Sequence, residues 1–391
     1  MHLKTPPSIN KTVIATGLAL FAMFFGAGNI VFPLYLGAHA GQNILPTILG
    51  FLLSGVGVPI LGLIATSLYQ GNYQAFFGRL GRVPAFFIIT VLMVILGPLI
   101  AMPRTETTTF NALLPFLASG LKSNTLFSIL YCGIAFFLSY RETKIIHILG
   151  FFLSPVKIVS FSCLVLFGLL FTTPPLINSD TPIQAFNHSV SYAYNTMDLI
   201  GTFFFCAIAF NSLTQQLKAH PNLNMTKLTL IASLIGGSIT SLVYIGFLLV
   251  AHYHSDILQG VAVEQTIAVL SSEILGKFGS IFVCVSVSFA CMATTVALAQ
   301  VFTEYLYRTL LKERLPRALC LTGVIFVTYL MSNLDFQGIL KISAPLVNIL
   351  YPALIVLCIF NILHKWKGLQ IVRLPVFTMM LIMSASSLFA N

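Results

Sequence analysis

The chain has 391 residues, of which 57% are hydrophobic and only 8% are charged, and its formal net charge is +10. Soluble domains carry roughly 25% charged residues, so this composition excludes a soluble multidomain enzyme, a disordered chain and a nucleic-acid-binding protein. A membrane span needs roughly 20 apolar residues. We therefore predict an all-α polytopic membrane protein in which little of the chain is left for a soluble domain.

We expect the apolar segments to be helices, because an open strand edge cannot satisfy its backbone hydrogen bonds in lipid. The third segment, 84–103, could continue as a helix to about 118. The predicted segments are 12–38, 43–69, 84–103, 124–140, 146–171, 195–217, 228–251, 278–306, 318–332, 343–363 and 374–390.

The basic residues predict the orientation of the chain. If the N-terminus is cytoplasmic and the spans alternate, most of the twenty lysines and arginines fall on the inner side. Cytoplasmic loops carry an excess of these residues. We therefore expect a cytoplasmic N-terminus.

The first segment contains the strongest candidate site, Gly26-Ala27-Gly28-Asn29 followed by Pro33. Two glycines, an asparagine and a proline within one span predict a break in the helix. The freed N–H groups attract a carboxylate, and the freed carbonyls can hold a small cation. The alternative is that Gly-x-Gly only allows two helices to approach closely.

The sixth segment is the second candidate, because Asp198 is one of few acidic residues at membrane level. Spans one and six would be the matching broken helices of two five-helix repeats, and repeat-built transporters bind substrate between such helices. Asp198 would then hold the ammonium group of a substrate. The alternative is an interfacial aspartate that only caps its helix.

Two threonines of the eighth segment, Thr294 and Thr295, could provide hydroxyl ligands to Na⁺, although such hydroxyls usually bond back to their own helix. Near the outer end of the third segment, Arg104 and Glu106 suggest an external ion pair or gate; the alternative is an interfacial anchor. Lys157 lies about eleven residues into the fifth segment, roughly 16 Å deep. A desolvated lysine at that depth can exchange a proton.

The motifs in this order resemble the branched-chain amino acid carriers of the bacterial LIV-II type, which belong to the leucine-transporter-type (LeuT) superfamily. The resemblance covers nearly the whole chain. The matching stretches are Phe24–Asn29 with Phe32-Pro33, Gly97–Thr105, Thr196-Met197-Asp198, Ala290-Cys291, Lys341–Pro345 and Tyr351-Pro352.

The resemblance implies a LeuT-type 5+5 inverted-repeat bundle in the plasma (inner) membrane, with broken helices 1 and 6. Residues 12–172 would form the first repeat, 195–363 the second, and 374–390 an additional span. The implied function is import of leucine, isoleucine or valine by alternating access. The coupling ion would be Na⁺ or H⁺, with no other cofactor, no metal beyond a Na⁺ site, no nucleic-acid partner and a monomeric transport unit in the bilayer.

The resemblance also implies residue roles. The substrate carboxylate would be bound at the break by Gly26, Ala27, Gly28 and Asn29. The side-chain pocket would be lined by Phe203, Phe204 and Phe205, whose carbonyls would receive the ammonium group beside Asp198. The cation would be held by the carbonyls of Ala22 and Phe25 with Thr294 and Thr295.

The sequence departs from the family pattern at three points. Cys206 stands where the family usually has a glycine, which could stiffen the break in span six or reshape the pocket. Eleven spans are found where twelve are usual. Lys157 stands at a usually apolar position, and its ammonium could replace Na⁺ at the inner cation site. This predicts coupling to protons, or through Lys157, in place of simple Na⁺ symport.

Two other functions stay open. A carrier for another apolar or aromatic amino acid would use the same architecture, because apolar pockets discriminate poorly between side chains. A channel or an intramembrane enzyme is a different class. A channel requires a selectivity loop or rings of charge, and an enzyme requires a convergent catalytic set; we recognise neither in the sequence.

Overall fold

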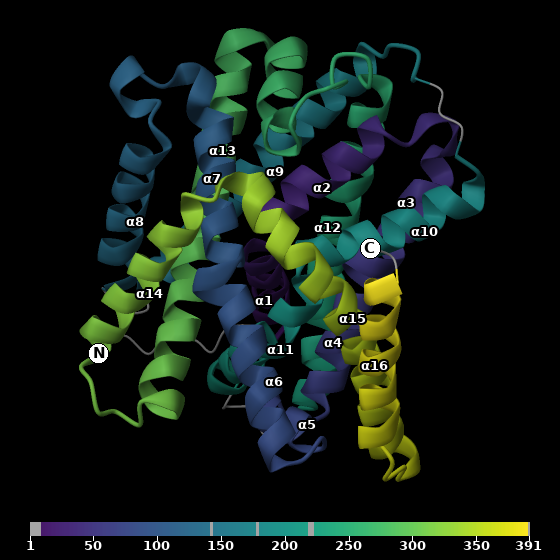
Figure 1. Ribbon diagram of the computed structural model, residues 1–391, viewed down its shortest axis with the longest axis vertical. Coiled ribbons are helices and arrows are strands. Elements are labelled where there is room, and N and C mark those ends of the chain that lie inside the picture. Colours follow the sequence, from purple (N-terminus) through teal and green to yellow (C-terminus); the bar gives the residue numbers. More distant parts are fainter. Residues whose placement is uncertain (1–8, 141–143, 177–179, 218–222, 390–391) are drawn as a thin grey trace.

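The computed structural model describes residues 9–140, 144–176, 180–217 and 223–389. These residues form a bundle of helices and contain no strand (Figure 1). The helices of the first half are α1 (Ile9–Phe24), α2 (Ala27–Ala38), α3 (Ile44–Leu52), α4 (Val58–Ser67), α5 (Tyr73–Gly78), α6 (Arg82–Val94), α7 (Ala101–Leu113), α8 (Asn124–Tyr140) and α9 (Lys144–Leu170). The helices of the second half are α10 (Pro182–Ala193), α11 (Asp198–Gln216), α12 (Met225–Tyr253), α13 (Thr266–Tyr305), α14 (Arg317–Ser332), α15 (Asp335–Lys367) and α16 (Arg373–Phe389).

Each predicted apolar segment corresponds to a helix or to helices that continue one another. Five of the described segments are long and apolar enough to cross a membrane, and up to seven if each of two bent helix pairs is one span. The other four predicted segments correspond to shorter apolar helices: Asn124–Tyr140, Pro155–Leu170, Arg317–Ser332 and Arg373–Ser386. The predicted membrane architecture is confirmed.

The third span is longer than its apolar run. A π-helical turn at Ile95–Leu99 joins α6 to α7, and the helical segment runs from Arg82 to Phe116. Its second half is rich in threonine and is nevertheless buried. This half faces protein in place of lipid, so hydropathy alone could not mark its end.

Both expected breaks occur, and the first lies where the sequence places it. Helices α1 and α2 are bent by 71°. Gly26 between them is extended (φ −114°, ψ −160°), and its N–H donates to Asn29 Oδ1 (3.1 Å). The Asn29 side chain therefore supplies the acceptor that the interrupted helix no longer provides.

The second break lies earlier than the expected position around Phe203–Cys206. Helix α10 with the 3₁₀ turn Tyr194–Thr196 meets α11 at a bend of 44°. The residue at the bend, Met197, adopts a left-handed conformation (φ 61°). The sixth span therefore begins at Pro182, and Cys206 lies inside the continuous helix α11, where it cannot stiffen the break.

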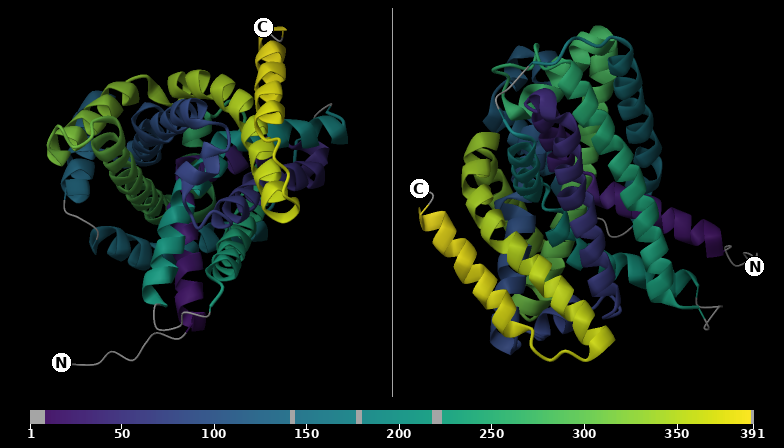
Figure 2. Two further views of the ribbon diagram at one scale, coloured as in Figure 1. Left: turned by 90° about the horizontal axis from the view of Figure 1, so that it is seen from below. Right: turned by 90° about the vertical axis from the view of Figure 1, so that its right-hand side faces the viewer.

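The two broken spans lie at the centre of the bundle. Helix α1 packs against α12 so closely that a Cβ on Gly236 would stand 2.8 Å from the Gly17 carbonyl oxygen. Helix α13 packs against both α7 and α9, and α11 packs against α4. At the edge of the bundle, α16 packs against α15 (Figures 1 and 2).

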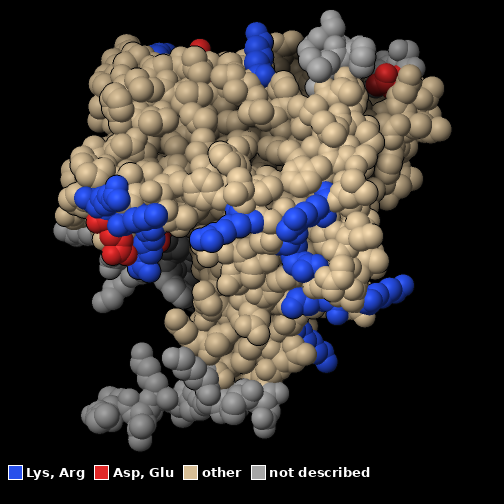
Figure 3. Space-filling view, turned by 60° about the horizontal axis from the view of Figure 1, so that its bottom comes forward, with Lys and Arg blue, Asp and Glu red and all other residues tan. Residues whose placement is uncertain are grey.

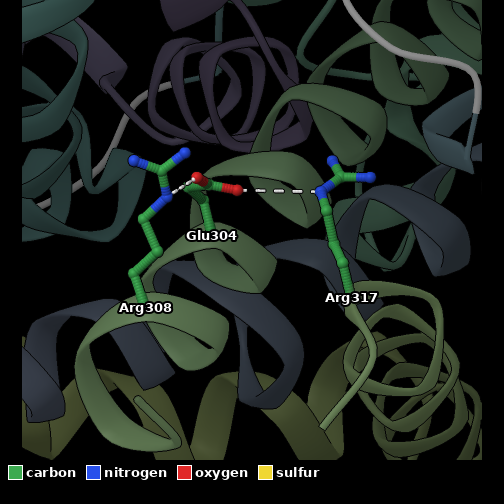
Figure 4. A network of polar contacts seen from close by, with 3 residues as sticks. All are labelled: Glu304, Arg308 and Arg317. Carbon is green, nitrogen blue, oxygen red and sulfur yellow. Dashed lines mark ion pairs between the residues drawn. The ribbon is translucent and has the colours of Figure 1, made fainter. Parts of the chain in front are cut away.

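Most of the basic side chains gather at one end of the molecule. Lysine and arginine side chains are spread across the end that lies lowest in Figure 1 (Figure 3). Connections at this end carry Arg79, Lys312 and Arg373. Here Glu304 at the end of α13 forms ion pairs with Arg308 and with Arg317 (3.6 Å), which joins α13 to the start of α14 (Figure 4).

Candidate functional site

A cavity lies between the two breaks. It is lined by the turn Gly26–Asn29 of the first span, by Thr196–Asp198 of the sixth, by Arg104 and Thr105 of α7 and by Thr294 of α13. The N–H groups in the first turn of α2 have no partners within that helix, so this end of α2 favours an anion. The structure thus brings four separate predicted sites together around one space.

Asn29 and Asp198 join the two breaks. The Asn29 Nδ2 atom donates to Asp198 Oδ2 (2.6 Å) and to the Tyr244 hydroxyl, and this hydroxyl donates to the same carboxylate oxygen (3.1 Å). Asp198 is only 6% exposed, so it is not an interfacial residue. Because Oδ1 of Asn29 accepts from Gly26, both ends of its amide are used inside the protein.

Arg104 lies beside the first break and not at the external surface. It is 3% exposed, and its Nη1 atom donates to the Asn195 carbonyl (2.9 Å) at the end of the helical part that precedes the second break. A Cβ on Gly28 would stand 3.2 Å from Arg104 Nη2. The guanidinium therefore contacts both broken spans.

Glu106 does not form the expected ion pair with Arg104. Residues two apart on a helix point in different directions, and the Glu106 carboxylate accepts from Ser128 of α8 (2.8 Å). No ion pair joins Glu106 to Arg104, both of which lie in the described part of the chain. Glu106 is fully buried, so it is not an interfacial anchor either.

The apolar part of the cavity is formed by Met23, Phe24, Leu96, Phe205 and Leu298. The Phe24 and Phe205 rings meet edge to face with centroids 5.4 Å apart. Of the three phenylalanines predicted to line the pocket, only Phe205 does so.

The other two phenylalanines point elsewhere. Phe203 packs between Phe76 and Phe77, and Phe204 packs on Tyr73. All three belong to the continuous helix α11, whose interior carbonyls accept hydrogen bonds within the helix.

The predicted cation ligands divide into two groups. In a regular helix the Gly26 N–H would donate to the Ala22 carbonyl. Here it donates to the Asn29 side chain, so the Ala22 carbonyl lies at the interrupted end of α1, beside Phe25. Thr294 lies against the same turn, because a Cβ on Gly26 would stand 3.2 Å from its Oγ1. Hydroxyl and carbonyl oxygens of this kind suit a hard cation.

Thr295 faces the other way. Its hydroxyl lies in a cluster with the hydroxyls of Thr105 and Tyr131 (2.8 Å to Tyr131), between α13, α7 and α8. It also donates to the Cys291 carbonyl (3.0 Å). The structure therefore places Thr294, but not Thr295, beside the first break.

Lys157 is buried to 1% exposure on the face of α9 that packs on α13 and α1. Its ammonium group lies within electrostatic range of Cys291 of α13, which is one helical turn before Thr294. One turn further along α9, the Phe161 ring lies 5.4 Å from the ring of Phe25. This face of α9 therefore lies toward the first break.

Sequence reasoning missed several residues of the site. Tyr244 completes the Asp198 network, and Tyr351 accepts from the Leu199 N–H (3.1 Å) at the start of α11. Leu96 and Leu298 line the cavity. The motif Tyr351-Pro352 was a usable signal, whereas the other three residues are ordinary members of apolar helices.

Comparison with known proteins identifies solved structures that share this architecture and a family that matches the chain. Solved structures of Mhp1 in an inward-facing conformation (TM-score 0.64, 15% identity, covering 90% of this chain and 77% of that one) and of MhsT with L-phenylalanine (TM-score 0.53, 16% identity, 95% and 98%) share the fold. Both are LeuT-fold transporters, which confirms the predicted fold class.

Two curated relatives are similar over most of their length. The branched-chain amino acid permease BrnQ of Bacillus subtilis (strain 168) is 32% identical over 91% of this chain and 82% of the relative. The permease of the same name from Escherichia coli (strain K12) is 27% identical over 95% and 85%. Residues 9–390 match the family model described as branched-chain amino acid transport protein. The chain belongs to this family of secondary transporters, and its relatives are permeases and not enzymes.

Proposed function

We propose that the protein is a symporter that imports leucine, isoleucine and valine by alternating access. The observation that carries the proposal is the cavity between the breaks, where Arg104 and Asp198 lie beside an apolar compartment formed by Phe24, Phe205 and Leu298. A free amino acid with an apolar side chain has three groups that match these features: a carboxylate for Arg104, an ammonium group for Asp198 and an apolar body for the apolar compartment.

The proposed orientation of the chain in the membrane rests on the distribution of its basic residues. The N-terminus would be cytoplasmic, because the basic end of the bundle matches the excess of lysine and arginine in cytoplasmic loops. We place the protein in the plasma (inner) membrane, with one chain as the transport unit.

The coupling ion is proposed to act beside the first break, through one of two arrangements. A Na⁺ ion would take the Ala22 and Phe25 carbonyls and the Thr294 hydroxyl. Alternatively, Lys157 binds a proton from the outer side and releases it to the inner side. The burial of Lys157 and its position near Cys291 of α13, one helical turn before Thr294, favour the proton arrangement.

The test uses purified protein in proteoliposomes with labelled isoleucine. A Na⁺ gradient is imposed in one set and a proton gradient in another, with unlabelled leucine, valine and phenylalanine as competitors. Concentrative, saturable uptake that leucine and valine inhibit is the expected result. Inhibition by phenylalanine alone would assign an aromatic substrate, and non-saturable flux would indicate a channel.

Lys157→Met decides between the two cation arrangements. With proton coupling, this variant should retain isoleucine binding and lose gradient-driven accumulation. Full, gradient-driven uptake by Lys157→Met would eliminate the role of Lys157. The matched control is Lys277→Met, because Lys277 is exposed on α13.

A further inference from the structure

Arg104 is a buried cation without an anionic partner. Among the described residues, no carboxylate lies within ion-pair distance of it. Its Nη1 atom is used by the Asn195 carbonyl, while its Nε and Nη2 atoms have no hydrogen-bond partner in the described part of the chain. Leaving buried charged donors unpaired is costly, so this side chain indicates a ligand.

The two unpartnered atoms are adjacent in the guanidinium plane. The Nε–H bond and one Nη2–H bond point in the same direction along one edge of the group. This edge is the fork that binds both oxygens of a carboxylate in a bidentate arrangement. The Nη1 bond to the Asn195 carbonyl leaves the edge free and fixes its plane.

Aromatic rings hold the guanidinium in place. Its Cζ atom lies 4.7 Å from the centroid of the Phe32 ring and 5.5 Å from that of Phe336. These cation–π contacts stabilise the charge without neutralising it. The guanidinium is therefore positioned before any anion binds.

The guanidinium adjoins a second group of anion-binding donors. Its Nη2 atom lies against Gly28 in the first turn of α2, where the helix N–H groups have no partner within the helix. Both features line the same cavity as Asp198. An α-carboxylate here would meet the arginine fork and the helix N-terminus while the ammonium group faces Asp198.

We propose that Arg104 binds the α-carboxylate of the transported amino acid through Nε and Nη2. This assignment rests on the proposed function. It makes Arg104 a substrate-binding residue in place of the external gate that its sequence position suggests. Arg104 then selects zwitterionic amino acids over amines and amides of the same shape.

The test compares two ligands on four proteins. The ligands are isoleucine and isoleucinamide, which keeps the ammonium group and the side chain but has no carboxylate. The proteins are the wild type, Arg104→Gln, Arg104→Lys and the control Arg308→Gln, whose guanidinium is exposed at the charged end of the bundle. Equilibrium binding is measured at mildly acidic pH on purified protein, and thermal unfolding reports whether each variant is folded.

The wild type should bind isoleucine at least about tenfold more tightly than isoleucinamide, a comparison that needs no variant. Arg104→Gln should weaken isoleucine binding about ten- to hundredfold and change isoleucinamide binding less than about threefold. Arg104→Lys, which keeps the charge without the fork, should fall between. Arg308→Gln should match the wild type.

Equal losses for both ligands in Arg104→Gln would overturn the assignment, because they would mean that Arg104 only positions Asn195 and Gly28. Equal wild-type affinity for the two ligands would also overturn it. If the wild type bound phenylalanine but no branched-chain amino acid, the proposed substrate would fall, and the same ligand pair built on phenylalanine would still decide the role of Arg104.

Discussion

The Asn29 amide donates a 2.6 Å hydrogen bond to the Asp198 carboxylate and so connects the break in the first span with the start of α11. The two residues are 169 positions apart in the chain. Tyr244 of α12 donates to the same carboxylate. The centre of the molecule is therefore a single polar network between helices from both halves of the chain, and it adjoins the cavity.

Asp198→Asn should reduce isoleucine affinity about ten- to hundredfold, because the variant keeps acceptors for Asn29 and Tyr244 but removes the charge that faces the substrate ammonium. Equilibrium binding of labelled isoleucine measures this loss. Glu273→Gln is the control, since Glu273 is exposed. Unchanged binding in Asp198→Asn would show that the carboxylate only joins the two helices.

Gly28→Ala should weaken substrate binding while the protein stays folded. A Cβ at this position would stand 3.1 Å from the Thr196 backbone and 3.2 Å from Arg104 Nη2, and overpacking of this kind costs about 1–3 kcal/mol. The comparison is Gly133→Ala in α8, where a Cβ meets nothing within 4 Å. If both variants transported equally well, the close approach at Gly28 would have no functional role.

Phe205→Ala and Phe203→Ala should have different effects although the residues are neighbours in sequence. Phe205 lines the cavity, so its removal should enlarge the apolar compartment and allow methionine or phenylalanine to compete with isoleucine uptake. Phe203 packs between Phe76 and Phe77, so its removal should cost about 3–5 kcal/mol of stability. Competition assays and thermal unfolding measure the two effects. The reverse pattern would contradict this division of α11.

Glu304→Gln should leave stability nearly unchanged. The carboxylate pairs with Arg308 and Arg317, but its side chain is 41% exposed and that of Arg308 is 68% exposed. Exposed ion pairs contribute less than about 1 kcal/mol. A large drop in unfolding temperature would mean that this network holds α13 and α14 together.

The sequence predicts the first break far better than the second. The first break can be predicted from the local sequence, because each of four nearby residues disfavours a regular helix or supplies a cap: Gly26, Gly28, Asn29 and Pro33. The second break occurs at Met197, a residue with no local preference for a left-handed conformation. It is stabilised by tertiary contacts that local sequence does not contain: Arg104 on the Asn195 carbonyl and Tyr351 on the Leu199 N–H.

The predicted position of Arg104 at the outer surface was wrong for a related reason. Counting roughly 20 apolar residues from the start of the third span places Arg104 at the outer surface. The helical segment continues to Phe116 because its threonine-rich half is surrounded by other helices and not by lipid. Hydropathy reports contact with lipid, and so it cannot locate residues in a span that is enclosed by protein.

A site that contains both Arg104 and Asp198 suits a zwitterion, and the neutrality of such a substrate affects what an electrical recording would measure. The cavity is lined by one basic and one acidic side chain, and a zwitterion that fits between them has no net charge, so its transport moves none. The current per imported amino acid would then equal the charge of the coupling ions alone. A ratio of charge to radiolabel flux on the same vesicles would therefore give the ion stoichiometry directly, without correction for the substrate.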